Sequence, residues 1–143
     1  MTRPVVIDTN IALDLWVFDD AVSAPLRQAL EAGQCEWLVT SAMRDELQRV
    51  LDYPHIAQRR NRDGVSAEAV LAHFDRLAQM HPVAPKAPYV CKDEDDQKFI
   101  DVAVAHQALL LSKDKQVLRL TNRLARLGVV VRRQWTASSM EDA

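Results

Sequence analysis

The chain has 143 residues, of which 48% are hydrophobic and 27% are charged, and its formal net charge at pH 7 is −2. This length is typical of one domain, and the hydrophobic fraction is sufficient for a buried core. No apolar run approaches the roughly 20 residues of a membrane span, and the start lacks the basic flank and long apolar stretch of a signal peptide. We therefore expect a globular cytoplasmic protein without membrane association. The two cysteines, Cys35 and Cys91, do not have metal-binding spacing, and we expect them to be free thiols.

The first half of the chain alternates short β-type runs with helical patterns, which is typical of a parallel sheet flanked by helices. Ser66 is the expected N-cap of the longest helix, which reaches about Met80, and the preceding Asn61–Gly64 forms a turn. The other expected elements are strands at residues 5–7 and 36–39, and helices at 11–18, 24–32, 41–51 and about 56–60.

The second half begins with an irregular connection at residues 81–88, which contains three prolines. The expected elements that follow are a brief strand at 89–90, a helix at about 95–107, a strand at 109–111, helix in one or two pieces at 115–127, and a strand at 129–131. We predict one α/β, Rossmann-like domain over residues 1–135. Its central parallel sheet would have four to five strands flanked by helices, and residues 136–143 would form a frayed polar tail.

Asp8 directly follows the first predicted strand and precedes a helix. The carboxyl ends of parallel strands form the usual binding crevice of an α/β sheet, so a carboxylate at this point is well placed for chemistry. Capping of the next helix is an equally good interpretation of Asp8 alone. Asp114 repeats the same pattern after the strand at 109–111, and Ser112 before it would orient a carboxylate or cap the turn.

Glu46 shares a helix face with the apolar residues Met43, Leu47 and Val50, because residues three and four apart lie on one face. A carboxylate on an apolar face is costly unless it is paired or bound to a metal ion. A salt bridge is one explanation, and we favour metal binding.

The run Asp93–Asp96 lies at the start of a predicted helix, where acids complement the helix dipole. The dipole accounts for Glu94 and Asp95. Asp96 instead shares its face with Phe99 and Ile100 and is the best inward-facing candidate.

Four acids are thus predicted at the same edge of one sheet, and clustered carboxylates repel each other unless a cation lies among them. A set of oxygen ligands suits Mg²⁺ or Mn²⁺ better than zinc, which usually has His or Cys ligands. The four histidines have no ligand spacing, and no glycine-rich phosphate loop or Ser-His-Asp order is present.

Basic residues are concentrated near the end of the chain, where seven of them lie between residues 113 and 133. Solvated helix faces explain any one of these charges. Together they also suit a phosphate-binding surface beside an acidic metal site. The candidates for binding an RNA backbone are Lys113, Lys115, Arg119 and Arg123.

Four segments, VVIDTN at 5–10, TSAMRDEL at 40–47, DEDDQKFIDVAVA at 93–105 and LLSKD at 110–114, resemble PIN-domain proteins in order and spacing. The similarity covers residues 5 to 131 and is greatest to the branch that comprises toxin components of type II toxin–antitoxin pairs. The Asp-x-Asp-Asp-x-x-Phe stretch is fairly specific to that branch, whereas Asp-Thr-Asn is common across the superfamily.

The resemblance implies a Mg²⁺- or Mn²⁺-dependent endoribonuclease whose acidic quartet is Asp8, Glu46, Asp96 and Asp114, with Asn10 as a supporting residue. Many relatives carry a further acid where this chain has Gln97, which leaves Asp93 or Asp96 as the third ligand. Many also carry a second Asp where this chain has Gln116, so a second metal ion would bind weakly. The resemblance also implies an RNA substrate, a small antitoxin partner and a homodimer.

Three other functions fit parts of the pattern. An RNA-processing nuclease without a toxin role would have the same site. A non-catalytic module would bind RNA and leave it intact. A phosphatase with an aspartate nucleophile would also use an acid at a strand end, but such enzymes usually have a second acid two residues later, where this chain has Asn10.

Overall fold

Five parallel strands form the central sheet of the computed structural model, which describes residues 2–140. Their order across the sheet is β3-β2-β1-β4-β5, and in β1 Val5 is level with Trp37 of β2 and Leu109 of β4. This confirms the predicted α/β architecture with a parallel sheet flanked by helices. The strands are β1 Arg3–Ile7, β2 Cys35–Val39, β3 Ala78–Met80, β4 Leu109–Leu111 and β5 Val131–Arg132.

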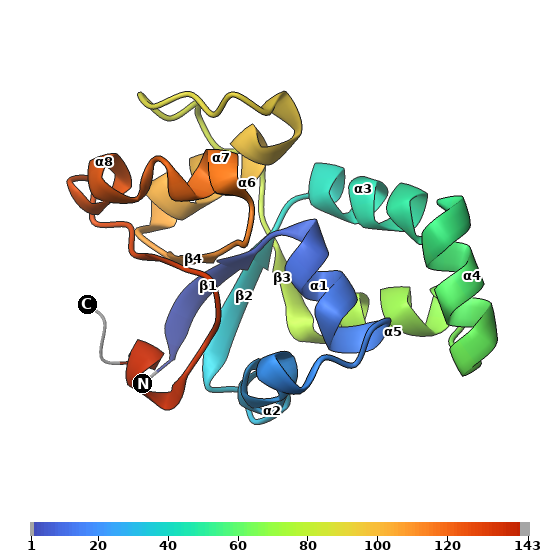
Figure 1. Ribbon diagram of the computed structural model, residues 1–143. Coiled ribbons are helices and arrows are strands. Elements are labelled where there is room, and N and C mark those ends of the chain that lie inside the picture. Colours follow the sequence, from blue (N-terminus) through green and yellow to red (C-terminus); the bar gives the residue numbers. More distant parts are fainter. Residues whose placement is uncertain (1, 141–143) are drawn as a thin grey trace.

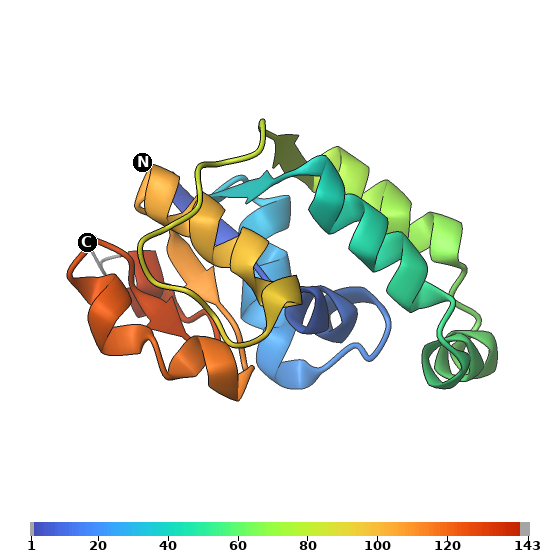
Figure 2. The same ribbon diagram turned by 90° about the horizontal axis from the view of Figure 1, so that it is seen from above.

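Helices connect the strands and cover the sheet (Figure 1). Helix α6 packs against β1 and β4, and crosses over them in Figure 2, whereas α2 packs against β2. In both views α4 lies at the end of the molecule farthest from α7 and α8. The α-helices are α1 Thr9–Trp16, α2 Ala24–Glu31, α3 Ser41–Leu51, α4 Pro54–Asp63, α5 Ala67–Leu77, α6 Glu94–His106, α7 Lys115–Leu118 and α8 Thr121–Ala125, and a 3-10 helix covers Ala21–Ser23.

Several expected elements differ from the structure. The strand expected at 129–131 is β5 at Val131–Arg132, and residues 129 and 130 precede it. The helix expected to reach Met80 ends at Leu77, because residues 78–80 pair with β2 and form the edge strand β3. The brief strand expected at 89–90 is a bend without strand pairing. The turn expected at 61–64 is wrong for residues 61–63, because α4 continues to Asp63 and ends on Gly64 with φ 72°.

The core lies on both faces of the central strand β1 and of its neighbour β4. Val5 and Val6 of β1 and all three residues of β4 are fully buried, which explains why these strands are continuous apolar runs. Burying each such side chain contributes about 1.5–3 kcal/mol. The residues that follow β1 and β4 therefore emerge from a rigidly packed base at the same edge of the sheet.

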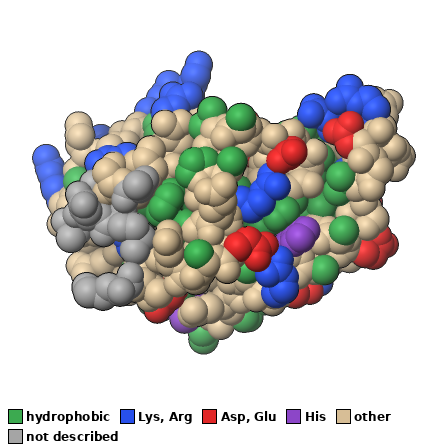
Figure 3. Space-filling view, turned by 90° about the horizontal axis from the view of Figure 1, so that it is seen from below, with side chains coloured by type: hydrophobic (Ala, Val, Ile, Leu, Met, Phe, Trp, Pro, Cys, Tyr) green, Lys and Arg blue, Asp and Glu red, His purple; other side chains and the backbone are tan. Residues whose placement is uncertain are grey.

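The last described element is a 3-10 helix, Ala137–Met140, in which the Oγ of buried Ser139 accepts a hydrogen bond from the backbone N of Thr136 at 2.9 Å. Residues 141–143 of the predicted frayed tail lie outside the described residues. Both cysteines are buried free thiols, as expected. None of the helices within residues 2–140 is long and apolar enough to cross a membrane. On the face shown in Figure 3, Lys and Arg side chains lie in separate groups instead of one continuous patch.

Candidate metal centre

The centre lies where β1 and β4 end side by side. Ile7 is level with Leu111 in the parallel ladder, and the backbone N of Asp8 donates to the carbonyl of Leu111 at 3.1 Å. The residues after the two strands, Asp8 on one side and Ser112 with Asp114 on the other, are therefore adjacent in space.

Asp8 is 3% exposed and uses both of its carboxylate oxygens. Its Oδ1 accepts from the backbone N of Ile11 at 2.9 Å, which caps α1, and its Oδ2 accepts from the Oγ of Ser112 at 2.6 Å. Burial raises the pKa of Asp8 to about 6, and the negative charge of Asp114 adds to the rise, against the lowering by the two hydrogen bonds. Asp8 thus caps a helix and also lines the acidic site, so the two interpretations of this residue are compatible.

Three aspartates make the tightest acidic group among the described residues. Asp93, Asp96 and Asp114 each offer a carboxylate oxygen, and these oxygens lie within 4.8 Å of one another. The structure therefore places both candidates for the third acid beside Asp114.

Asp96 has the features of a carboxylate that lacks its counter-charge. Its Oδ2 is buried and has no hydrogen-bond partner. Burial, followed by the charges of Asp114 and Asp93, raises the pKa of Asp96 to about 7. A buried, unpartnered oxygen next to two further carboxylates fits a divalent cation with oxygen ligands.

The two other aspartates of this group are held by helix starts. Asp93 Oδ1 accepts from the backbone N of Asp95 at 3.0 Å and caps α6, and Asp114 Oδ1 accepts from the backbone N of Gln116 at 2.7 Å and caps α7. The backbone N of Asp114 donates to Ser112 Oγ at 3.1 Å. Ser112, which is fully buried, therefore connects Asp8 to the loop that carries Asp114.

Glu46 is buried on the inner face of α3, as expected, but it is paired. Lys98 Nζ donates to its Oε1 at 2.7 Å, and the hydroxyl of Thr9 donates to its Oε2. The salt bridge, which we disfavoured from the sequence, is therefore present. Glu46 does not belong to the group formed by the three aspartates.

These acids line one cleft of about 390 Å³. Asn10, Arg49 and His55 also line it, and its apolar wall contains Tyr53, which is 42% exposed. The carboxylates of the cleft are Asp8, Glu46, Asp93, Asp95, Asp96 and Asp114, and its apolar residues are Leu13, Phe18, Val50, Tyr53 and Ile56.

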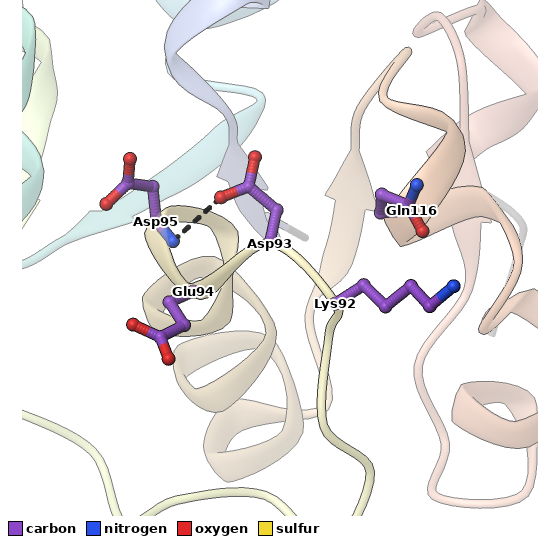
Figure 4. A pocket seen from close by; sticks show the side chains of 5 residues that line it. All are labelled: Lys92, Asp93, Glu94, Asp95 and Gln116. Carbon is purple, nitrogen blue, oxygen red and sulfur yellow. Dashed lines mark hydrogen bonds between the residues drawn. The ribbon is translucent and has the colours of Figure 1, made fainter.

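A second, more open pocket lies beside Asp93 and is lined by Lys92 and Gln116 (Figure 4). Lys92 extends towards the side of Gln116, whereas Glu94 and Asp95 point the other way. This side of the centre therefore carries an amide and an ammonium group.

The four basic residues expected to bind RNA lie outside the set that lines the acidic cleft. Lys113 forms an ion pair with the buried Asp14 of α1. The other three are exposed: Lys115 on α7, Arg119 at the C-cap of α7, and Arg123 on α8.

Sequence reasoning missed Thr9, Lys92 and Lys98, and also Arg49 and Tyr53 of the cleft wall. Thr9 and Lys98 form hydrogen bonds with Glu46 although they are 37 and 52 residues away from it in the sequence. Helical periodicity relates only residues of the same helix and cannot predict such contacts. Lys92 directly precedes the acidic run, and this position next to Asp93 is the sequence feature that indicates a place at the site.

Comparison with known proteins identifies a family and a similar solved structure. The family model of the PIN domain matches residues 4–116. No curated protein sequence matches the chain. Among solved structures, the chain is similar to one in the crystal structure of VapBC2 from Rickettsia felis bound to a DNA fragment from their promoter. The TM-score is 0.58 and the identity 14%, over 91% of this chain and 98% of that one. This structural similarity supports the fold.

Proposed function

The chain belongs to the PIN-domain family of nucleases, and we propose that it is a Mg²⁺- or Mn²⁺-dependent endoribonuclease that cleaves single-stranded RNA. The observation that carries this proposal is the group of Asp93, Asp96 and Asp114, in which one buried Asp96 oxygen has no partner. A bound divalent ion would neutralise this group, activate water and stabilise charge on the scissile phosphate.

The side chains of the centre have distinct parts in this proposal. Asp96 and Asp114, with Asp93, would hold the ion. Asp8 completes the acidic wall, and its hydrogen bonds to Ser112 and the start of α1 fix the direction of its carboxylate. Glu46 is the fourth acid of the quartet and lies on the α3 side of the same cleft. Asn10, which also lines the cleft, would support the substrate or a bound water.

The residues of the cleft wall are the basis for proposing a single-stranded substrate. The exposed ring of Tyr53 offers a surface on which an unpaired base can stack, and Arg49 beside it would contact a phosphate. Lys92, and the exposed Lys115, Arg119 and Arg123 on the α7 side, would contact the RNA backbone farther from the centre. The ion pair of Lys113 with Asp14 makes it the weakest of the predicted RNA contacts.

The test is cleavage of a labelled single-stranded RNA by the purified chain with Mn²⁺, with Mg²⁺ and with EDTA. We expect cleavage with either metal and none in EDTA, and we expect Asp96→Asn to abolish it. The matched control is Asp45→Asn, because Asp45 lies on α3 next to Glu46 but is exposed to solvent. Full activity of Asp96→Asn, or equal cleavage in EDTA, would refute the proposal.

The same preparation separates the alternative functions. A non-catalytic module would bind the RNA and leave it intact with Mn²⁺ present. A phosphatase with an aspartate nucleophile would hydrolyse a generic phosphomonoester, and its aspartyl-phosphate could be trapped.

The biological role that we propose is that of a cytoplasmic toxin, as a homodimer silenced by a small antitoxin protein. The fold similarity to a chain of VapBC2 supports this role. Expression of the chain should arrest growth, expression of Asp96→Asn should not, and co-expression of a small neighbouring gene should restore growth. Normal growth with an active nuclease would instead favour RNA processing without a toxin role.

A further inference from the structure

Lys98 contacts Glu46, an acid that lines the cleft, and its side chain makes three contacts in all. It follows Asp96 by two residues on α6, and its ammonium group donates to Glu46 Oε1 at 2.7 Å and to the carbonyl oxygen of Asp95. It also lies 5.0 Å from the ring centroid of Phe99. The side chains of Lys98 and Glu46 are 22% and 11% exposed, so this pair is shielded from solvent.

Glu46 has no carboxylate oxygen left without a partner. Lys98 occupies Oε1 and the hydroxyl of Thr9 occupies Oε2. Asp96 differs, because its Oδ2 is buried and unpartnered. Glu46 therefore differs from the group of Asp93, Asp96 and Asp114, because a cationic side chain already neutralises its charge.

This division has an electrostatic consequence for metal binding. A metal ion at Glu46 would have to displace the ammonium group, or approach it closely, and two cations repel strongly in a partly buried cleft. The ammonium supplies one positive charge on the α3 side of the cleft without any metal ion.

We infer that Lys98 is a positioning residue that holds Glu46 out of the metal coordination sphere, so that the chain binds one divalent ion, at Asp93, Asp96 and Asp114. This inference rests on the proposed function, because it concerns the same metal centre. It differs from the expectation from the sequence, in which Glu46 is a metal ligand.

The experiment counts Mn²⁺ ions bound by the full chain, using calorimetry and the electron paramagnetic resonance signal of free Mn²⁺. We expect one ion per chain in the wild type. Lys98→Met removes the charge but keeps an apolar stem against Phe99, and we expect a second bound ion and about tenfold tighter binding of the first. Lys98→Arg keeps the charge and is the matched control, for which we expect one ion.

The double variant Lys98→Met with Glu46→Gln tests whether the second ion depends on Glu46, and we expect it to bind one ion. Lys98→Gln, which is neutral but can still donate to Glu46, replaces Lys98→Met if the latter does not fold, with the same second ion expected. Two ions in the wild type would overturn the inference, as would an unchanged count and affinity in the neutral variants.

Cleavage of RNA measured on the same samples separates this inference from the proposed function. A chain that binds one Mn²⁺ and gains a second in Lys98→Met, yet leaves RNA intact, would refute the nuclease and support the role of Lys98. A chain that cleaves RNA with two bound ions would support the nuclease and overturn the role of Lys98. A chain that binds no Mn²⁺ would overturn both.

Discussion

Asp8→Asn should make the metal-free protein more stable at pH 8, although it removes a carboxylate from the proposed centre. The Asp8 side chain is 3% exposed, and burial raises its pKa from 3.8 to about 6. The folded state therefore holds the proton of Asp8 to a higher pH than the unfolded state. Because of this difference, the free energy of unfolding of the wild type falls as the pH rises from about 4 to about 6.

The size of this effect follows from the same values. A rise from 3.8 to about 6 corresponds to about 3 kcal/mol of stability lost once Asp8 is ionised in both states. The asparagine of the variant has no charge to bury, and its amide oxygen can still accept from the backbone N of Ile11. Rearrangement of the hydrogen bond to Ser112 would cost about 1 kcal/mol at every pH. We therefore expect a net gain of about 2 kcal/mol at pH 8 and a small loss at pH 4.

The measurement is urea unfolding in EDTA at pH 4, 6 and 8 for the wild type, Asp8→Asn and the exposed control Asp45→Asn. The difference between Asp8→Asn and the wild type should change by about 2–3 kcal/mol between pH 4 and pH 8. A difference that is the same at both pH values, or a variant that is less stable at pH 8, would show that burial of the Asp8 charge has no such cost.

Three further predictions concern the surroundings of the centre and one turn. Mn²⁺ affinity should fall about tenfold or more from pH 8 to pH 6, because burial and the charges of Asp114 and Asp93 raise the pKa of Asp96 to about 7 and the ion must compete with the proton. Calorimetry at each pH measures this fall, and a flat profile would contradict it. Ser112→Ala should lower the free energy of unfolding by about 1–3 kcal/mol, since it leaves Asp8 Oδ2 and the Asp114 N–H without their partner; an unchanged urea midpoint would count against this. Gly128→Ala should cost about 1–2 kcal/mol, because Gly128 has φ +81°. It should cost more than Gly33→Ala, since a Cβ at 128 would lie 2.7 Å from Gln107 Nε2 whereas that at 33 meets open space.

Local signals predicted the parts of the fold that depend on neighbours in sequence. The bounds of α3 match the expectation because Tyr53-Pro54 interrupts the helical pattern, and the buried runs of β1 and β4 are apolar throughout. Strand β3 could not be predicted this way. Ala78–Met80 is a strand because it pairs with Trp37–Val39, which lies about 40 residues earlier in the chain. Val90, which we placed in a strand, is 60% exposed and has no such neighbour.

The same limit applies to the acidic centre. The helical periodicity correctly predicted that Glu46 lies on the buried side of α3. The positions of Asp8 and Asp114 after parallel strands correctly predicted that Asp8 lies beside the loop of Asp114. The partner of Glu46 could not be predicted, because Lys98 reaches it from a different helix. The choice between Asp93 and Asp96 also depends on how α6 sits over β1 and β4, and the packed chain brings both to Asp114.

Three acids of the cleft, Asp8, Asp93 and Asp114, also begin helices α1, α6 and α7. An ion held by the group of three aspartates would join the starts of α6 and α7, and it would tighten the first turn of both helices at once. Loading with Mn²⁺ should therefore slow amide hydrogen exchange at these two helix starts more than in the sheet. An alanine in place of any of these acids removes a cap worth about 1 kcal/mol together with the carboxylate, whereas asparagine keeps the cap. Asparagine variants are thus the ones that separate loss of chemistry from local unravelling.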